Sequence, residues 1–358
     1  MKITAANLNN FIILPKPFRC IIDGLYEIIY NMTIYNDIRR LLPSIAAVAV
    51  LLSSGCGQSG SRESGPHPFP VPEVPSMIGS GREAVSYLAA HFWDRFTDTS
   101  QIYVCDSSIV NGVLESDVEQ AFADWAGYLR SGTPDDAREA VSAMFRRIAA
   151  FERRDTSTNV FETVSSLAEK YLYDPNSPLR SEDLYLPFAS AMSSSPLVPP
   201  EKRAVYEYDA KMCSLNRTGS PAADFRFMDK AGRSHTLYGI DAEYTLLFFS
   251  NPGCEACKYI IDALESDTAL GSMVSSGRLA VANIYIDEDI EAWYGYQDIY
   301  PDSWYNGYDP DFIIRTDLLY NVRAIPSLYL LDRDKKVLLK DAPEDRVFAA
   351  LHRIGDGQ

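Results

Sequence analysis

The stretch Tyr244-Thr-Leu-Leu-Phe-Phe-Ser-Asn-Pro-Gly-Cys254-Glu-Ala-Cys257 carries more information than any other part of this chain. An apolar run leads to two cysteines separated by two residues, and the segment after them has helical spacing. The partial positive charge at a helix N-terminus stabilises a thiolate on the first cysteine. The pattern therefore predicts that Cys254 is the nucleophile in thiol–disulfide exchange and that Cys257 resolves the mixed disulfide.

Cysteine pairs with this spacing also bind zinc or staple a loop. A structural zinc site usually takes four ligands, often from two such pairs. The sequence has no second pair of this spacing, and its four histidines are scattered along the chain. We therefore predict no metal site and no separate cofactor, because the Cys254–Cys257 disulfide is itself the redox group. A stable structural disulfide is the alternative.

A second stretch, Asn321-Val-Arg-Ala-Ile-Pro326-Ser-Leu-Tyr-Leu-Leu-Asp332, reads as a strand that begins with a proline. Proline lacks a backbone N–H, so within sheets it belongs at the start of a strand or at a special bend. The segment Val337-Leu-Leu-Lys340 is typical of the returning strand of a hairpin.

Together, these stretches resemble the thioredoxin superfamily, in which a cis-proline loop faces the CxxC pair. The resemblance implies that the Ile325–Pro326 bond is cis, and that Ile325 and Pro326 bind an extended substrate segment. The segment Gly219–Leu237 resembles the entry hairpin of the TlpA/ResA-like branch, whose members are membrane-tethered. Residues 215–358 are thus expected to form an α/β thioredoxin-like domain with a central mixed sheet flanked by helices.

The chain departs from the thioredoxin pattern near the cysteines. Phe248 stands where many thioredoxins carry a buried acid, so no carboxylate is assigned to remove the proton of Cys257. Glu255 disfavours a thiolate and Lys258 favours one. A reductant or isomerase is expected rather than a strong oxidant. The aromatic segment Glu291–Tyr308 reads either as an extra element packed on the sheet or as a groove, lined by Trp293, Trp304 and Tyr305, that receives a polypeptide.

The N-terminal region is expected to direct export. Residues 39–56 join a basic flank, a short apolar run and small residues before Cys56. Ser53-Ser-Gly-Cys56 resembles a bacterial lipobox, which implies lipidation of Cys56. Residues 1–55 are therefore predicted to be a signal peptide region, with Met32 as the suspected true start. Residues 56–77, rich in Gly, Ser and Pro, are expected to form a flexible tether.

Residues 78–214 show the spacing of a small all-α helical bundle. Expected helix starts include a capping box at Ser116–Glu119 and a cap at Thr133. The region resembles a helical domain of unknown function that precedes thioredoxin-like domains in some Gram-negative lipoproteins, with His91-Phe-Trp-Asp-Arg-Phe96 as one matching patch. The aromatic residues of that patch are predicted to lie in the core.

These observations predict a lipoprotein of the periplasm or cell envelope that reduces or isomerises disulfides in client proteins. An inner-membrane redox partner would regenerate it, and a lipid would hold it to the membrane. The formal net charge of −16 argues against nucleic acid as a partner. A non-catalytic interaction module with a structural disulfide is the alternative. A thiol peroxidase is disfavoured, because this sequence lacks the residues that activate peroxide around a reactive cysteine. Cys105 and Cys213 either pair in an oxidising compartment or remain free.

Overall fold

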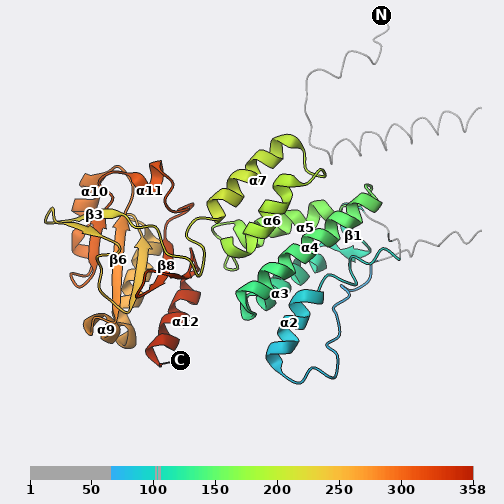
Figure 1. Cartoon of the computed structure of the whole chain (residues 1–358), viewed down its shortest axis with the longest axis horizontal. Helices are drawn as coiled ribbons and strands as arrows, with labels where there is room; N and C mark the ends of the chain where they lie inside the picture. The colour runs from blue at the N-terminus through green and yellow to red at the C-terminus, as the bar shows by residue number, and fades with distance from the viewer. Residues whose placement is uncertain (1–65, 101–102, 104–105, 358) are drawn as a thin grey trace, which may run out of the picture. The chain divides into compact units, whose positions relative to one another are not determined.

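The computed structural model describes residues 66–100, 103 and 106–357, which all belong to the unit Ser61–Gln358 (Figure 1). The first part of this unit is helical. Its elements are α2 (Gly81–His91), α3 (Glu115–Ser131), α4 (Pro134–Arg154), α5 (Val160–Ala168), the π-helix η2 (Glu169–Tyr173), α6 (Glu182–Ser194) and α7 (Pro200–Cys213). A small hairpin, β1 (Ile109–Val110) with β2 (Val113–Leu114), precedes α3 and was not expected from the sequence.

The helix starts agree only partly with the expected caps. The Thr133 hydroxyl accepts a hydrogen bond from the N–H of Asp136 at 3.2 Å, as the sequence predicts. The predicted capping box at Ser116 is wrong, because α3 already begins at Glu115 and no side chain caps it. Strand β2 runs directly into this helix, and the N–H of Glu115 donates instead to the carbonyl of Ser108 at 2.9 Å.

The core of the helical part is aromatic. Phe92, Trp93 and Phe96 are all buried, which confirms the interpretation of that patch as core. The indole of Trp93 packs edge-on against Trp125, and Trp125 donates a hydrogen bond to the carbonyl of Ala89 at 2.9 Å. This bond satisfies the one polar atom that Trp125 brings into the interior.

Within the described residues, the second part contains a seven-stranded mixed sheet in the order β4-β3-β7-β6-β5-β8-β9. Strands β5 and β6 and strands β6 and β7 are parallel, and the other neighbours are antiparallel. The strands are β3 (Arg226–Asp229), β4 (Ser234–Thr236), β5 (Tyr244–Phe249), β6 (Leu279–Tyr285), β7 (Tyr305–Tyr308), β8 (Ser327–Asp332) and β9 (Val337–Leu339). The helices are α8 (Glu255–Ser266), α9 (Thr268–Ser275), α10 (Ile290–Gly295), the 3-10 helix η3 (Gln297–Ile299), α11 (Ile313–Thr316) and α12 (Glu344–Gly355).

Strand β5 lies inside this sheet, between β6 and β8, and is buried on both faces. Its side chains alternate between two cores, because successive residues of a strand point to opposite faces. Leu246 and Phe248 belong to a cluster formed with α8, α9 and α12. Leu247 and Phe249 belong to the cluster on the other face. The mixed sheet flanked by helices that was predicted for this part of the chain is thereby confirmed.

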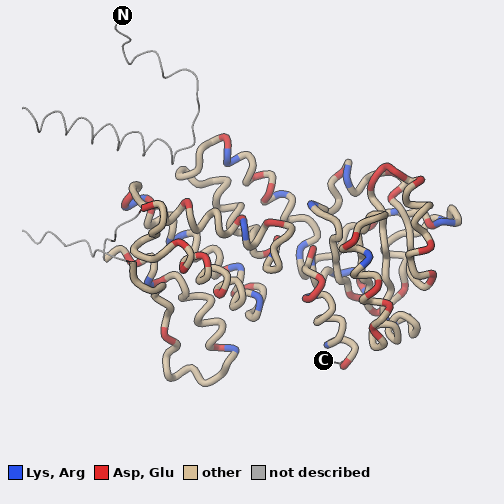
Figure 2. Tube along the Cα trace, turned by 180° about the vertical axis from the view of Figure 1, so that it is seen from behind, with Lys and Arg blue, Asp and Glu red and all other residues tan. Residues whose placement is uncertain are grey.

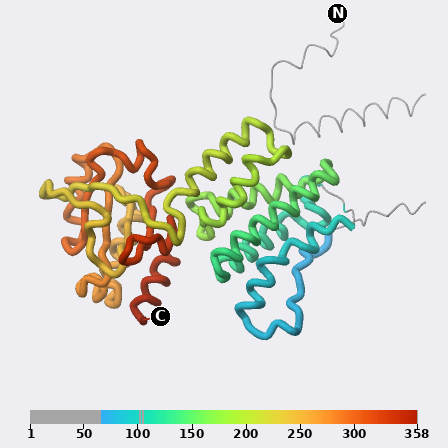
Figure 3. The backbone as a smooth tube through the Cα atoms, in the orientation of Figure 1, coloured from blue at the N-terminus to red at the C-terminus, as the bar shows by residue number. Residues whose placement is uncertain are grey.

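The segment between α7 and β3 runs along the outer strand β9, as can be followed in Figure 3. The N–H of Gly219 donates to the carbonyl of Val337 at 2.8 Å, and the N–H of Val337 donates to the carbonyl of Ser220 at 2.9 Å. The segment thus covers a sheet edge whose backbone groups would otherwise be open to pairing with another chain.

Acidic positions outnumber basic ones along the chain and are spread over both the helical part and the sheet part (Figure 2). Among the described residues, no helix has the length and apolar character needed to cross a membrane.

Candidate functional site

Cys254 is the N-cap residue of α8. Its Sγ accepts a hydrogen bond from the backbone N–H of Cys257 at 3.1 Å, and the two cysteines form a disulfide with a Cα–Cα distance of 5.2 Å. A sulfur in this position lies at the positive end of the helix dipole and within reach of a free N–H group, and both features favour a thiolate over a thiol.

The two cysteines differ in exposure. Cys254 is half-buried, whereas Cys257 is only 2% exposed and packs in the apolar cluster that contains Phe248 and Ile260. A reagent that approaches from solvent therefore reaches the Cys254 sulfur first. Phe248 stands where many thioredoxins carry a buried acid, and it lies in the same cluster as Cys257. An apolar side chain at this position offers no acceptor for the Cys257 proton.

A tight turn presents Cys254 at the end of β5. The N–H of Cys254 donates to the carbonyl of Asn251 at 3.3 Å, and Gly253 has a φ of 72°. Proline followed by a glycine with positive φ is the signature of a type II turn, so Pro252 and Gly253 form the turn that presents Cys254.

Polar side chains tie this turn to the neighbouring strands. The Asn251 amide donates to Oδ2 of Asp287 at 2.6 Å, and Arg315 forms an ion pair with the same carboxylate. The hydroxyl of Ser250 donates to the side-chain oxygen of Asn283 on β6, and both residues are buried. These residues were not predicted as part of the site: Asn283 lies on β6, Arg315 lies on α11, and the others lie in connecting loops.

The Ile325–Pro326 peptide bond is cis, as the resemblance implied, and β8 begins directly after it at Ser327. Ser327 pairs with Phe249, the last residue of β5. Because the two strands are antiparallel, the start of β8 and the end of β5 meet at the same end of the sheet. The register therefore places the proline beside the segment that leads to Cys254, and Ile325 and Cys254 pack against the same hydrophobic cluster.

The groove interpretation of the aromatic segment is wrong for its two tryptophans. Trp293 is fully buried and Trp304 is 8% exposed, and both belong to the cluster beneath α8. Tyr305 is half-buried at the start of β7, where it borders a surface cavity together with His235 and Asp302. The segment thus supplies core packing, because its large apolar rings fill the space between α10 and the sheet.

A buried ionic network next to the proline loop is the main feature that sequence analysis missed. Glu182 of α6 is 2% exposed and contacts Asn321, Arg323 and Lys340 of the sheet part. Burial raises the pKa of Glu182, and the charge of Lys340 opposes that shift. Nothing in the local sequence marks Glu182 as buried, since an acid in the first turn of a helix is usually a solvated residue that stabilises the helix dipole.

Within the described part of the chain, no group of three or more His, Cys, Asp or Glu side chains is arranged to hold a metal ion. Cys213 is buried and free, and burial raises the pKa of its thiol. Cys105, its suggested partner, and Cys56, the predicted lipidation site, lie outside the described residues, as do the predicted signal peptide region and residues 56–65 of the predicted tether.

Comparisons with known proteins agree with this geometry. A family model, a domain of unknown function called DUF5106, matches residues 47–216. The crystal structure of a thioredoxin-like protein from Bacteroides caccae is 33% identical, covers 80% of this chain and 98% of its own, and superposes with a TM-score of 0.68. The C-terminal domain of an uncharacterized protein from Bacteroides fragilis is 42% identical over 38% of this chain and 98% of its own, with a TM-score of 0.37.

The thioredoxin domain of a thiol-disulfide oxidoreductase from Bacteroides vulgatus is 19% identical over 38% of this chain and 97% of its own, with a TM-score of 0.33. No protein of curated function matches the chain. The Bacteroides caccae alignment is long enough to include both the helical part and the sheet part. With that alignment, a CxxC pair at the N-terminus of α8 and a cis-proline at the start of β8, this chain belongs to the thioredoxin superfamily.

Proposed function

We propose that this protein is a lipid-anchored, envelope-facing thiol–disulfide oxidoreductase that reduces or isomerises disulfides in client proteins. The observation that carries the proposal is the unequal pair at the start of α8. The half-buried Cys254 accepts an N–H hydrogen bond at a helix N-terminus, and Cys257 lies behind it in an apolar core. A purely structural disulfide has no need of this asymmetry, whereas exchange requires one accessible sulfur and one protected sulfur.

In the proposed reaction, the Cys254 thiolate attacks one sulfur of a client disulfide. A Cys254–client S–S bond forms while the client bond breaks, and the other client sulfur leaves as a thiolate. Cys257 loses its proton to solvent and attacks Sγ of Cys254. The Cys254–Cys257 bond forms, and the second client sulfur is released. The client has then gained two electrons and, after protonation, two protons.

Regeneration of the dithiol requires two electrons from outside the protein. We assign this role to an inner-membrane redox partner that carries a dithiol of its own. The backbone of Ile325, next to the cis-proline Pro326, is the proposed docking edge for an extended client segment. The proposed location is the periplasm or cell envelope, with the protein held to a membrane through a lipid on Cys56.

A Cys257→Ala variant tests the exchange reaction. If Cys254 is the attacking thiol, the variant accumulates mixed disulfides with clients, which migrate as larger species and are identified by mass spectrometry. The Cys254→Ala/Cys257→Ala variant is the matched control and forms none of them. Equal adduct patterns in the two variants would overturn the assignment of Cys254.

The reduction potential of the pair separates the proposal from the structural alternative. A value far below about −300 mV indicates a stable staple, whereas a redox-active pair lies above it. Lipidation is tested separately, because a Cys56→Ser variant should fail to incorporate labelled fatty acid and should leave the membrane fraction.

A further inference from the structure

The cis-proline loop is held by the helical part of the chain. Upstream of Pro326, the side-chain amide of Asn321 donates to Oε1 of Glu182 at 2.6 Å, and Nε of Arg323 donates to the same oxygen at 3.1 Å. Both donors lie within five residues of the proline. A single acceptor atom on α6 therefore fixes the chain that enters the proposed client-binding edge.

Arg323 makes two more contacts with the helical part. Its guanidinium lies 4.0 Å from the ring centroid of Tyr173, and it also donates to the carbonyl of that residue. A guanidinium that is stacked and hydrogen-bonded in this way has few alternative positions. The conformation of the residue three places before Pro326 therefore depends on η2 and α6, in addition to an ion pair of 3.6 Å between Arg323 and Asp341 within the sheet part.

The residue after the proline is held from the other side. The Ser327 hydroxyl donates to Oδ1 of Asp341 at 2.7 Å, and Nε of Arg180 donates to the carbonyl of Asp341 at 3.1 Å. Arg180 precedes α6, so the helical part reaches this side of the loop as well. The contacts bracket the proline on both sides.

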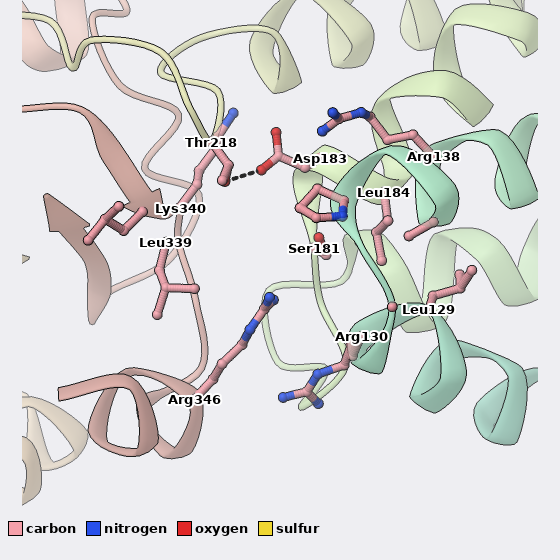
Figure 4. Close-up of a pocket in the computed structure, with 14 residues that line it drawn as sticks. Leu129, Arg130, Arg138, Ser181, Asp183, Leu184, Thr218, Leu339, Lys340 and Arg346 are labelled. Atoms are coloured by element: carbon pink, nitrogen blue, oxygen red, sulfur yellow. Dashed lines mark hydrogen bonds between the residues drawn. The ribbon is translucent and has the colours of Figure 1, made fainter. Parts of the chain in front are cut away.

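The network is buried, so its members tolerate little change in their relative positions. Glu182 and Lys340 are each 1% exposed at the side chain and form an ion pair at 2.8 Å. In such surroundings a charge without its partner is costly, so the partners are confined to a narrow set of positions. Figure 4 shows the adjoining contact, in which the Thr218 hydroxyl donates to Asp183, the residue after Glu182.

We propose that Glu182 is a positioning residue for the cis-proline loop, and that the helical domain thereby controls how well client polypeptides dock next to Cys254. This inference rests on the proposed oxidoreductase function. It assigns the helical domain a task within the reaction, because the domain supplies the acceptor that orients Asn321 and Arg323. A small disulfide that needs no strand-like contact with Ile325 should be indifferent to this acceptor.

Two double variants of the full-length protein test the role of Glu182. Both replace Lys340 by Met, so that neither leaves a buried ammonium opposite a neutral side chain. In Glu182→Gln/Lys340→Met, the Gln oxygen still accepts from Asn321 and Arg323. In Glu182→Met/Lys340→Met, this acceptor is lost. The measurements are the second-order rate constants of the pre-reduced protein with insulin, a protein disulfide, and with 5,5′-dithiobis(2-nitrobenzoate), a small disulfide.

We expect the Met/Met variant to react about three- to tenfold more slowly with insulin and at an unchanged rate with the small disulfide. The Gln/Met variant should keep both rate constants close to those of the wild type. Lys335→Met is a further control, because it removes a buried lysine that bonds to Ile240 and Thr245 and touches no residue of the network. It should leave the ratio of the two rate constants unchanged.

Equal insulin rates in the Met/Met and Gln/Met variants, with both folded, would overturn the positioning role. An equal decrease of the Met/Met variant's rate constants with insulin and with the small disulfide would also overturn it. Failure of the proposed function itself looks different, because the wild type would then not reduce insulin, although its accessible thiol would still react with the small disulfide.

Discussion

Phe249, the last residue of β5, stands opposite Ser327, the first residue of β8. This pairing brings together two loops that are distant in the sequence, one ending at Cys254 and one containing Pro326. It places a half-buried sulfur at the start of α8 beside the proposed docking edge for an extended client segment.

In the reduced protein, iodoacetamide should alkylate Cys254 at least about tenfold faster than it alkylates Cys257. The helix N-terminus stabilises its thiolate, and Cys257 is only 2% exposed. Fragmentation mass spectrometry of the peptide that contains both cysteines gives the two rates. The buried Cys213 provides an internal reference for a protected thiol. Preferential labelling of Cys257 would reverse the assigned roles.

Gly253→Ala should destabilise the protein by about 1–2 kcal/mol, because its φ of 72° is unfavourable for a residue with a Cβ. A Cβ at this position would meet no atom within 4 Å, so the cost comes from the backbone alone. Urea unfolding of the oxidised protein measures the change.

Gly271→Ala in α9 is the matched control, since its added Cβ also meets nothing. It should instead stabilise the protein by about 0.5–1 kcal/mol through helix propensity. If both substitutions changed the free energy of unfolding in the same direction, the turn geometry assigned to Gly253 would be contradicted.

Lys340→Met alone should destabilise the protein by about 3–5 kcal/mol, because Glu182 would keep a buried charge without its closest charged partner. Lys340 also donates to the carbonyl of Cys213 at 2.7 Å, so that acceptor is left unpaired too. Glu182→Met/Lys340→Met should recover most of the loss. A double-mutant cycle from urea unfolding checks this, and additive single effects would mean that the pair is not coupled.

Asp229→Asn should destabilise the β3–β4 hairpin by about 1–3 kcal/mol at neutral pH. Burial opposes ionisation of Asp229, but hydrogen bonds from His235 and Arg233 outweigh it and hold the pKa of the carboxyl well below its usual range. A depressed folded-state pKa means that the stabilisation is complete above the unfolded pKa and is lost as the pH falls. The extra stability of the wild type over Asp229→Asn should therefore decrease progressively as the pH falls below about 4.

Thermal unfolding of both proteins between pH 7 and pH 2 measures this difference. Asp302→Asn is a suitable control, because Asp302 is exposed and pairs only with Lys230 among the described residues. A stability difference that stays constant down to pH 2 would show that the Asp229 carboxylate does not carry the effect.

Much of the fold was predictable because it is encoded locally. The alternation of β5 between two cores, the hairpin around Asp229 and the cap at Thr133 depend on residues a few positions apart. The cysteine pair and the proline at the head of a strand are also local patterns. Local patterns failed where a neighbouring element replaced the expected contact, as at Ser116, where β2 runs directly into α3.

The CxxC spacing before a helix was enough to predict the proposed exchange chemistry, because the helix N-terminus sets the reactivity of the first thiol. The surroundings of the two thiols depend on tertiary packing. Trp293 is buried rather than open to a client, and Glu182 is a buried anchor rather than a solvated helix cap. Asn321 and Glu182 are 139 residues apart in the chain, so their hydrogen bond depends on how two folded parts pack, which no local pattern records.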